Sequence, residues 1–364
     1  MRTTRTVLAV AVSLFIANQA MAVSEITQDQ TGTDNVADAT QSGDSNLISQ
    51  TQDGTANLVR TVQNSYAMSA ISNQTGTANM AFIDQAGNEG QVEIDQSGEF
   101  NLATVAQFSE EVGHLAAITQ LGENNIAYVE QLDGVANRAI INQDGEANAA
   151  EVFQEGNSNF YEGTQTGSGN IAQISQDWFA TATTEQNGTG NQIYLTQEGF
   201  PYGVTASIRQ DGTNNRADVE QPMHGRYPVG SVDLEQLGTD NIAEVMQNTG
   251  DGSMTYTQDG TGNTLTTLQT GRSNSISGIT IGDDNSVDIR QEYDSNSVAI
   301  SQDGTQNEID VIQETYGSNA DIQQTGSQNI ASLLQTGGFD SVGGFDATII
   351  QNGTGNTATI TQGP

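Results

Sequence analysis

The side chains that recur most regularly in this 364-residue chain are amides, which form hydrogen bonds rather than act as acids, bases or nucleophiles. The segment 72–85, SNQTGTANMAFIDQ, shows their spacing, because Gln74 and Gly76 are followed by Asn79 and then by Gln85. The template Gln-x-Gly-x-x-Asn-x-Ala-x-h-x-Gln, where h is aliphatic, returns about every 22 residues along the chain. About fifteen copies follow one another, and a period of this length predicts a solenoid.

An amide carries both donors and acceptors, so identical amides stacked in register can satisfy one another as ladders. Gln closes each repeat and Asn opens its last strand, and both residue types return at fixed positions. We therefore select the repeated amides near the two ends of the chain as candidate ladder residues. They are Gln30, Asn35, Gln41, Gln52, Asn57, Gln63, Gln74, Asn79, Gln85, Gln324, Asn329, Gln335, Gln351, Asn356 and Gln362.

The elements that position these amides are short β-strands. From Asn79 to Gln85 the recurring residues are two apart, whereas Met80, Phe82 and Asp84 between them vary among the copies. A period of two places alternate side chains on opposite faces of a strand. The recurring set is therefore predicted to point inward.

A second strand of the same length precedes each of these strands and ends on Gln in every copy except one, where Thr280 stands. Four residues of the form x-Gly-x-x join the two strands. A Gly at so regular a place predicts a backbone conformation with positive φ. The turn glycines near the ends are Gly32, Gly54, Gly76, Gly326 and Gly353.

Two short strands cannot bury their inward faces alone, so each unit must stack on the next. The predicted fold is all-β: a β-solenoid of about fifteen stacked strand-turn-strand repeats of about 22 residues, uncapped at both ends. Small aliphatic residues inside the solenoid would supply the hydrophobic contribution to its stability. The uncapped terminal strands would present unpaired N–H and C=O groups, which form a template for adding another chain.

Residues 1–22 do not belong to the repeat. They contain two arginines, then an apolar run and a small-residue cleavage site, which is the pattern of a cleaved secretory signal peptide. We expect residues 23–364 to form one repeat domain, because no linker or change in composition divides them. No other segment could span a bilayer, so no membrane span is expected in the mature chain.

The formal net charge is −36, from 45 acidic and 9 basic residues, which excludes nucleic-acid binding because that needs a basic surface. Cys is absent and the two histidines, His114 and His224, lie at or in turns of variable length. Neither a Ser-His-Asp arrangement nor a His/Cys metal cluster can be assembled from them. We therefore expect no catalytic residue, no metal site, no cofactor and no enzyme activity.

Length variation falls in the turn that returns from one repeat to the next, with the longest loops at 222–228 and 336–344. Asp precedes the turn Gly in five copies that are never neighbours, which suggests that stacked carboxylates are avoided. These copies contain Asp53, Asp144, Asp211, Asp259 and Asp303.

The segments QTGTANMAFIDQ at 74–85 and QLGENNIAYVEQ at 120–131 resemble the curlin repeat of the curli amyloid subunits. The resemblance covers essentially all of the mature chain, although this chain has many more repeats than the curli major subunit. It implies export, passage through an outer-membrane secretion pore, and assembly with a nucleator subunit into extracellular fibres at the bacterial surface. It also implies that the stacked Gln and Asn residues are the self-assembly positions.

The leading hypothesis is a structural subunit of a biofilm fibre that polymerises with copies of itself. A curli-type nucleator subunit shares the repeat and is the nearest alternative. A monomeric β-solenoid adhesin or ice-binding protein is a second class. Ice binding would need regular outward Thr rows, and the row of Thr357, Thr359 and Thr361 is interrupted in other copies by residues such as Phe82 and Asp84.

Overall fold

The structure is a computed structural model, and it describes residues 24–109, 113–200, 203–222, 229–337 and 344–364. The chain forms two compact units, Met1–Ala147 and Asn148–Pro364. The expected signal peptide 1–22 lies outside the described residues, as do His224 and residues 338–343 of the longest loop. The expectation of a single repeat domain over residues 23–364 stays a prediction.

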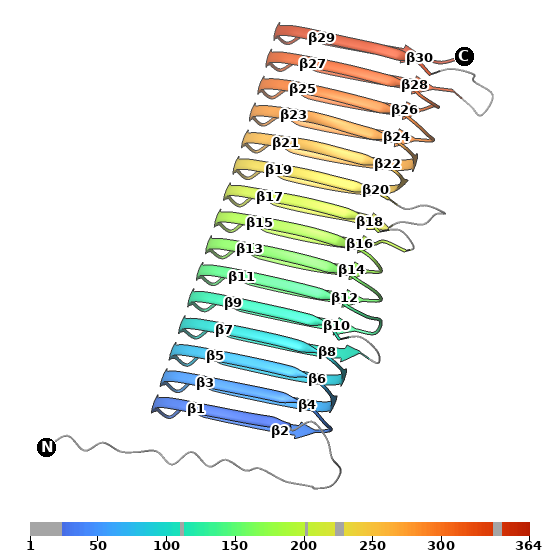
Figure 1. The fold of residues 1–364 in the computed structure, drawn as a ribbon. Coiled ribbons are helices and arrows are strands. Elements are labelled where there is room, and N and C mark those ends of the chain that lie inside the picture. Colours follow the sequence, from blue (N-terminus) through green and yellow to red (C-terminus); the bar gives the residue numbers. More distant parts are fainter. Residues whose placement is uncertain (1–23, 110–112, 201–202, 223–228, 338–343) are drawn as a thin grey trace, which may run out of the picture. The chain divides into compact units, whose positions relative to one another are not determined.

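The first unit contains two parallel sheets, A1 from odd-numbered strands and B1 from even-numbered strands (Figure 1). The described strands of sheet A1 are β1 (Glu25–Thr33), β3 (Leu47–Thr55), β5 (Ser69–Thr77), β7 (Gln91–Glu99), β9 (Leu115–Glu123) and β11 (Arg138–Glu146). Those of sheet B1 are β2 (Val36–Ser42), β4 (Leu58–Tyr66), β6 (Met80–Asn88), β8 (Leu102–Ser109) and β10 (Ile126–Leu132).

The second unit has the same construction, with sheets A2 and B2. The described strands of sheet A2 are β13 (Phe160–Ser168), β15 (Thr181–Thr189), β17 (Thr205–Thr213), β19 (Ser231–Thr239), β21 (Ser253–Thr261), β23 (Ser275–Asp283), β25 (Ser297–Thr305), β27 (Asn319–Ser327) and β29 (Asp346–Thr354). Those of sheet B2 are β12 (Ala149–Glu155), β14 (Ile171–Asp177), β16 (Gln192–Glu198), β18 (Arg216–Pro222), β20 (Ile242–Gly250), β22 (Thr264–Arg272), β24 (Ser286–Glu292), β26 (Glu308–Glu314), β28 (Ile330–Thr336) and β30 (Thr357–Gln362).

Within each unit, every strand pairs in parallel with the strand one repeat further along the chain, and equivalent residues face each other. In the β3–β5 pair, Gln52 lies opposite Gln74 and Gly54 opposite Gly76. One layer of the stack is therefore one repeat, as in solenoid proteins generally. The predicted fold class, an all-β solenoid, is confirmed.

The core lies between the two sheets of each unit and mixes aliphatic with amide side chains. Val59 and Ile94 are fully buried, and Gln63 and Asn79 are also fully buried. The residues between them in sequence are mostly part-buried or exposed, so burial alternates along each strand. The inward direction predicted for the recurring residues is confirmed.

The corner between the two strands of a repeat is tighter than the sequence suggested. Strand β3 continues through Gly54 to Thr55 and β4 begins at Leu58, so two residues rather than four form the turn. Gly54 has the expected positive φ of 131°, and a Cβ there would lie 2.0 Å from the carbonyl oxygen of Gly76 in the next layer. The chain reverses at a second left-handed residue, Ala56, with φ of 57°. Its N–H donates to Thr33 O at 2.9 Å, which holds the corner against the preceding layer.

Candidate functional site

The repeated glutamines of sheet A1 form a continuous side-chain ladder. Gln30 Nε2 donates to Gln52 Oε1 at 2.6 Å, and Gln52 Nε2 donates to Gln74 Oε1 at 2.9 Å. Further rungs of 2.7 to 2.8 Å join Gln74, Gln96, Gln120 and Gln143. Gln52 Nε2 also donates to Val36 O of the facing strand β2, at 3.1 Å. Both amide hydrogens and the amide oxygen of a buried Gln are thus used, which is what makes an interior amide tolerable.

Sheets B1 and B2 carry equivalent ladders. Gln41 Nε2 donates to Gln63 Oε1 at 3.0 Å, and Gln63 Nε2 donates to Gln85 Oε1 at 2.8 Å. In sheet B2 the ladder runs unbroken from Gln154 to Gln362, with N···O distances of 2.7 to 3.0 Å. In each of these rungs Nε2 of one layer donates to Oε1 of the next layer along the chain. The ladders therefore have a direction.

The repeated asparagines lie at the corners and bond to backbone groups as well as to one another. Asn79 Nδ2 donates to Gly98 O of the next layer at 2.9 Å. Asn79 Oδ1 accepts from the backbone N–H of Asn101 at 3.1 Å, and Asn79 N–H donates in turn to Asn57 Oδ1 at 3.0 Å. The Asn side chain thus satisfies corner groups that a strand ladder leaves unpaired.

The predicted ladder residues consequently separate into distinct sets. Gln30, Gln52 and Gln74 lie in sheet A1, whereas Gln41, Gln63 and Gln85 lie in sheet B1. In the second unit, Gln324 donates to Gln351 in sheet A2, and Gln335 donates to Gln362 in sheet B2, both at 2.8 Å. The corner set is Asn35, Asn57, Asn79, Asn329 and Asn356, with Asn356 N–H donating to Asn329 Oδ1 at 3.1 Å.

The ladder of sheet A2 changes its chemistry at Thr280, where the sequence departs from Gln. The Tyr256 hydroxyl lies 2.8 Å from Thr280 Oγ1, and Thr280 Oγ1 donates to Gln302 Oε1 at 3.4 Å. Because Thr280 uses its proton on Gln302, the Tyr256 hydroxyl must be the donor in the first bond. Gln258 Nε2 donates to the carbonyls of Ile242 and Asn263 instead. The hydroxyls of Tyr256 and Thr280 thus replace the missing Gln–Gln hydrogen bonds at this layer, and each donates toward the next layer along the chain, as the glutamines do.

Room for the buried Tyr256 ring comes from Gly278 in the next layer. A Cβ on Gly278 would lie 2.3 Å from the ring. Tyr161 is accommodated similarly, since a Cβ on Gly163 would lie 2.0 Å from its hydroxyl, which bonds to Thr184 Oγ1 at 2.8 Å. Burial raises the pKa of Tyr161 to about 12. Thr280 stands out as an exception in the sequence, whereas Tyr161 and Tyr256 were not identified from it as buried residues. The sequence pattern that could have revealed them is a Tyr at an inward position together with a Gly in place of an inward aliphatic residue.

His114 takes the place of an Asn at a corner of the first unit. Its Nδ1 accepts from the Asn137 N–H at 3.2 Å, so Nε2 carries the proton and donates to Phe108 O at 2.9 Å. The side chain is 1% exposed, and burial lowers its pKa from the ordinary histidine value. A protonated imidazole could not accept at Nδ1, so this contact requires the neutral form.

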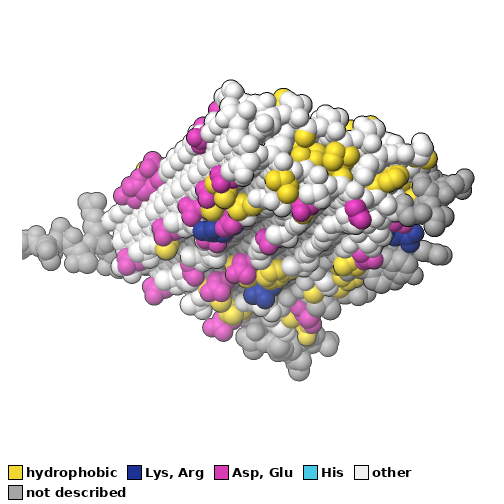
Figure 2. Space-filling view, turned by 90° about the horizontal axis from the view of Figure 1, so that it is seen from above, with side chains coloured by type: hydrophobic (Ala, Val, Ile, Leu, Met, Phe, Trp, Pro, Cys, Tyr) yellow, Lys and Arg dark blue, Asp and Glu magenta, His cyan; other side chains and the backbone are white. Residues whose placement is uncertain are grey.

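The outer faces carry many carboxylates and few cations, as the face in Figure 2 shows. Glu99, Glu123 and Glu146 lie at one position in three neighbouring layers, so the avoidance inferred for Asp before Gly does not extend to this position. Arg209 pairs with Glu235 and lies 3.8 Å from Glu185. In the part of the chain that the structure describes, no three His, Asp or Glu side chains are grouped to hold a metal ion.

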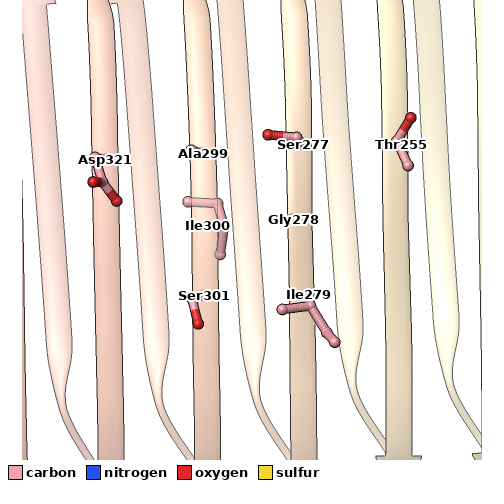
Figure 3. Close-up of a pocket in the computed structure, with 8 residues that line it drawn as sticks. All are labelled: Thr255, Ser277, Gly278, Ile279, Ala299, Ile300, Ser301 and Asp321. Atoms are coloured by element: carbon pink, nitrogen blue, oxygen red, sulfur yellow. The ribbon is translucent and has the colours of Figure 1, made fainter.

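A shallow depression of about 380 Å³ lies on the outer face of sheet A2 (Figure 3). Gly278 is among the residues that line the depression, and Figure 3 shows the side chains of Ser277 and Ile279 on either side of Gly278. Asp321 is the single titratable residue among those that line it. The depression therefore offers no acid-base pair.

The chain's repeat has a counterpart among known protein families. The family described as the curlin associated repeat matches residues 115–145, 260–292 and 282–314. These three segments of the chain are curlin associated repeats. The matched segments include the Gln120–Gln143 hydrogen bond of sheet A1. In sheet A2 they include Gly278 and Thr280. The resemblance read from the sequence is confirmed.

No curated protein matches this chain. The curlin repeat belongs to structural, non-enzymatic proteins associated with extracellular curli fibres, and the solenoid described above fits a curli-like structural protein. Among the described residues there is no helix long and apolar enough to cross a membrane.

Proposed function

We propose that this chain is a structural subunit of extracellular curli-like amyloid fibres and that it assembles by end-to-end β-stacking. The observation that supports this most directly is the complementary chemistry of the first and last described layers. Within the described residues, Gln30 Oε1 and Gln41 Oε1 accept no hydrogen bond. Gln351 Nε2 and Gln362 Nε2 each donate to one backbone carbonyl, at 3.0 Å, so each retains a second amide hydrogen.

A second copy stacked in the same parallel register would join these groups. Its Gln30 would lie over Gln351 and its Gln41 over Gln362, which continues both ladders with their direction unchanged. Asn356 Nδ2 would donate to Gly32 O of the incoming copy, as Asn329 Nδ2 donates to Gly353 O at 3.0 Å within the chain. Such a head-to-tail contact leaves one free end of each kind, so addition continues into a fibre.

Apolar burial supports the same contact. Ile26 of strand β1 is 40% exposed, whereas Ile48, its partner in the next layer of sheet A1, is fully buried. Stacking another layer on β1 would bury Ile26 similarly, at a gain of about 25 cal/mol per Å² of apolar surface. Both the hydrophobic and the amide contributions therefore favour a further layer.

The proposal includes the route to the fibre. The signal peptide 1–22 would direct export, and the mature chain would reach the cell surface through an outer-membrane secretion pore and start assembly on a nucleator subunit. A chain without Cys cannot be trapped by disulfides during such a passage. The fibre would then be part of the biofilm matrix and contribute to cell adhesion.

The test is incubation of the purified chain 23–364 without any other component. We expect fibres with a diffraction spacing of about 4.7 to 4.8 Å along the fibre axis. Fibre fragments should remove the lag phase when they are added as seeds. A chain that keeps its β-structure but stays monomeric for days at high concentration would refute the proposal and favour the monomeric adhesin.

A further inference from the structure

Two tyrosine rings lie against each other at the corners that follow β24 and β26 in the second unit. The ring centroids of Tyr293 and Tyr316 are 5.1 Å apart, and the ring planes are tilted by 32°. Both residues are half-buried, so both rings remain partly open to solvent. The two phenols are thus neighbours at a surface that a reagent in solution can reach.

Hydrogen bonds between layers hold both corners in place. Asn274 Nδ2 donates to Tyr293 O at 2.7 Å, which joins this corner to the preceding layer. The N–H of Gly317, the residue after Tyr316, donates to Asp294 O at 3.0 Å. Tyr316 is therefore held against the same corner that carries Tyr293, and the two rings stay neighbours.

The solenoid does not require a tyrosine at the first of these corners. Tyr293 lies two residues after Gln291 of the ladder. Gly156 and Gly271 hold the equivalent position in other layers, with φ of 78° and 102°. Tyr293 also has a positive φ, of 66°, which is unfavourable for a residue with a bulky side chain. A tyrosine at an unfavourable position beside a second ring points to a use of the pair beyond packing.

We propose that Tyr293 and Tyr316 form a site of oxidative modification, in which hydrogen peroxide and a peroxidase convert the pair into dityrosine. Each phenol loses one electron and one proton, and the two radicals join through the ring carbons next to the hydroxyls. One C–C bond thus replaces two C–H bonds. Hydrogen peroxide takes up the two electrons and the two protons and is reduced to two molecules of water.

The surroundings keep the Tyr316 hydroxyl protonated at neutral pH. Burial and the nearby Asp294 carboxylate raise the pKa of Tyr316. Its proton therefore leaves together with the electron. Because the two rings are already in contact, they can couple before either radical meets another chain.

The cross-link would stabilise the layers that it joins. It closes a loop that contains β25 and β26, which lowers the conformational entropy of the unfolded chain. The chain has no Cys, so no disulfide can have this effect. The inference goes beyond the proposed fibre and does not depend on it, because both tyrosines belong to one chain.

The test oxidises the purified chain 23–364 with hydrogen peroxide and a haem peroxidase at about 1 µM chain, far below the effective concentration of about 1 mM that a short tether gives. The monomer is then isolated by size under denaturing conditions and cut by a protease that cleaves after Glu, since Glu308 and Glu314 lie between the two tyrosines. Mass spectrometry detects the link as two joined fragments that together lack two hydrogen atoms.

The variants Tyr293→Phe and Tyr316→Phe each keep the ring and remove one phenol. The matched control is Tyr66→Phe, because Tyr66 ends β4 in the first unit, is 50% exposed and lies opposite Asn88 of the next layer. Urea unfolding before and after oxidation measures the stabilisation.

We expect the joined fragments of Tyr293 and Tyr316 in the parent and control chains, and their yield in the parent should exceed that of joined fragments containing Tyr66 by at least about tenfold. Both variants of the pair should lose these fragments. Oxidation should raise the urea midpoint of the parent and control chains but not of the two variants. An oxidised monomer without the joined fragments, or with links spread evenly over its tyrosines, would overturn the inference and leave the proposed function intact. A linked parent chain whose urea midpoint does not rise would overturn the stabilising role.

Discussion

The direction of the Gln ladders predicts that the two glutamines of the first layer control the strength of end-to-end addition. The perturbation is Gln30→Ala/Gln41→Ala, which removes the two oxygens that would accept from Gln351 and Gln362 of the preceding copy. Each joint, meaning the end-to-end contact between two copies, would then bury two amide hydrogens without a hydrogen-bond partner. A buried donor left unpaired costs about 1 to 3 kcal/mol, so the joint should weaken by about 2 to 6 kcal/mol.

Seeded assembly at several chain concentrations provides the assay, because the concentration of chain left in solution at equilibrium reports the strength of the joint. We expect it to rise at least about 30-fold, since about 1.4 kcal/mol corresponds to a factor of ten. The matched comparison is Gln63→Ala/Gln74→Ala, whose amides bond within one chain at 2.8 and 2.7 Å to the next layer. This change should lower the denaturation midpoint of the monomer and alter the joint much less.

Thr27→Ser and Thr357→Ser serve as outward controls near the two ends, since both side chains are exposed. The reasoning would be refuted if the Gln30→Ala/Gln41→Ala chain and these controls left the same concentration in solution. Amide stacking would then contribute nothing at the ends, and hydrophobic burial alone would drive addition.

Three further results are expected. Burial lowers the pKa of His114 in the folded state, so neutral His114 stabilises the fold fully above a pH of about 6.5, and this stabilisation is lost as the pH falls below that value. Urea titrations between pH 7.5 and 5 should show the loss. The His114→Asn chain should not show this pH dependence. Gly278→Ala should destabilise the second unit by about 1 to 3 kcal/mol, because the added methyl group would clash with the Tyr256 ring. Tyr256→Leu/Gly278→Ala should recover part of this loss. A double-mutant cycle of urea midpoints that shows no coupling between the two positions would contradict the described packing. Fibre formation should accelerate as the pH falls toward the pI of about 4.1 or as divalent cations are added, because both reduce repulsion between acidic faces. Asp310 on such a face has a pKa raised by burial and by the neighbouring Asp288. Lag times that do not change with pH and salt would show that the acidic exterior does not slow assembly.

The repeat itself determined the fold class, the inward residues and the place of the positive-φ glycine. These features depend on local properties: a strand alternates its faces every residue, and glycine adopts positive φ more readily than residues with a side chain. The alternation from Asn79 to Gln85 was therefore sufficient to place Asn79 and Gln85 inside, and Gly54 could be assigned its conformation from its recurrence.

Only the tertiary structure decided how the inward side chains share their hydrogen bonds. The donor direction from Gln52 to Gln74, the hydroxyl pair of Tyr256 and Thr280, and His114 in an Asn position all depend on contacts between layers about 22 residues apart in the chain. The second left-handed corner residue was also missed, because Ala56 carries no glycine-like signal. Its conformation is fixed by a hydrogen bond to the preceding layer, and the sequence of one repeat does not contain that constraint.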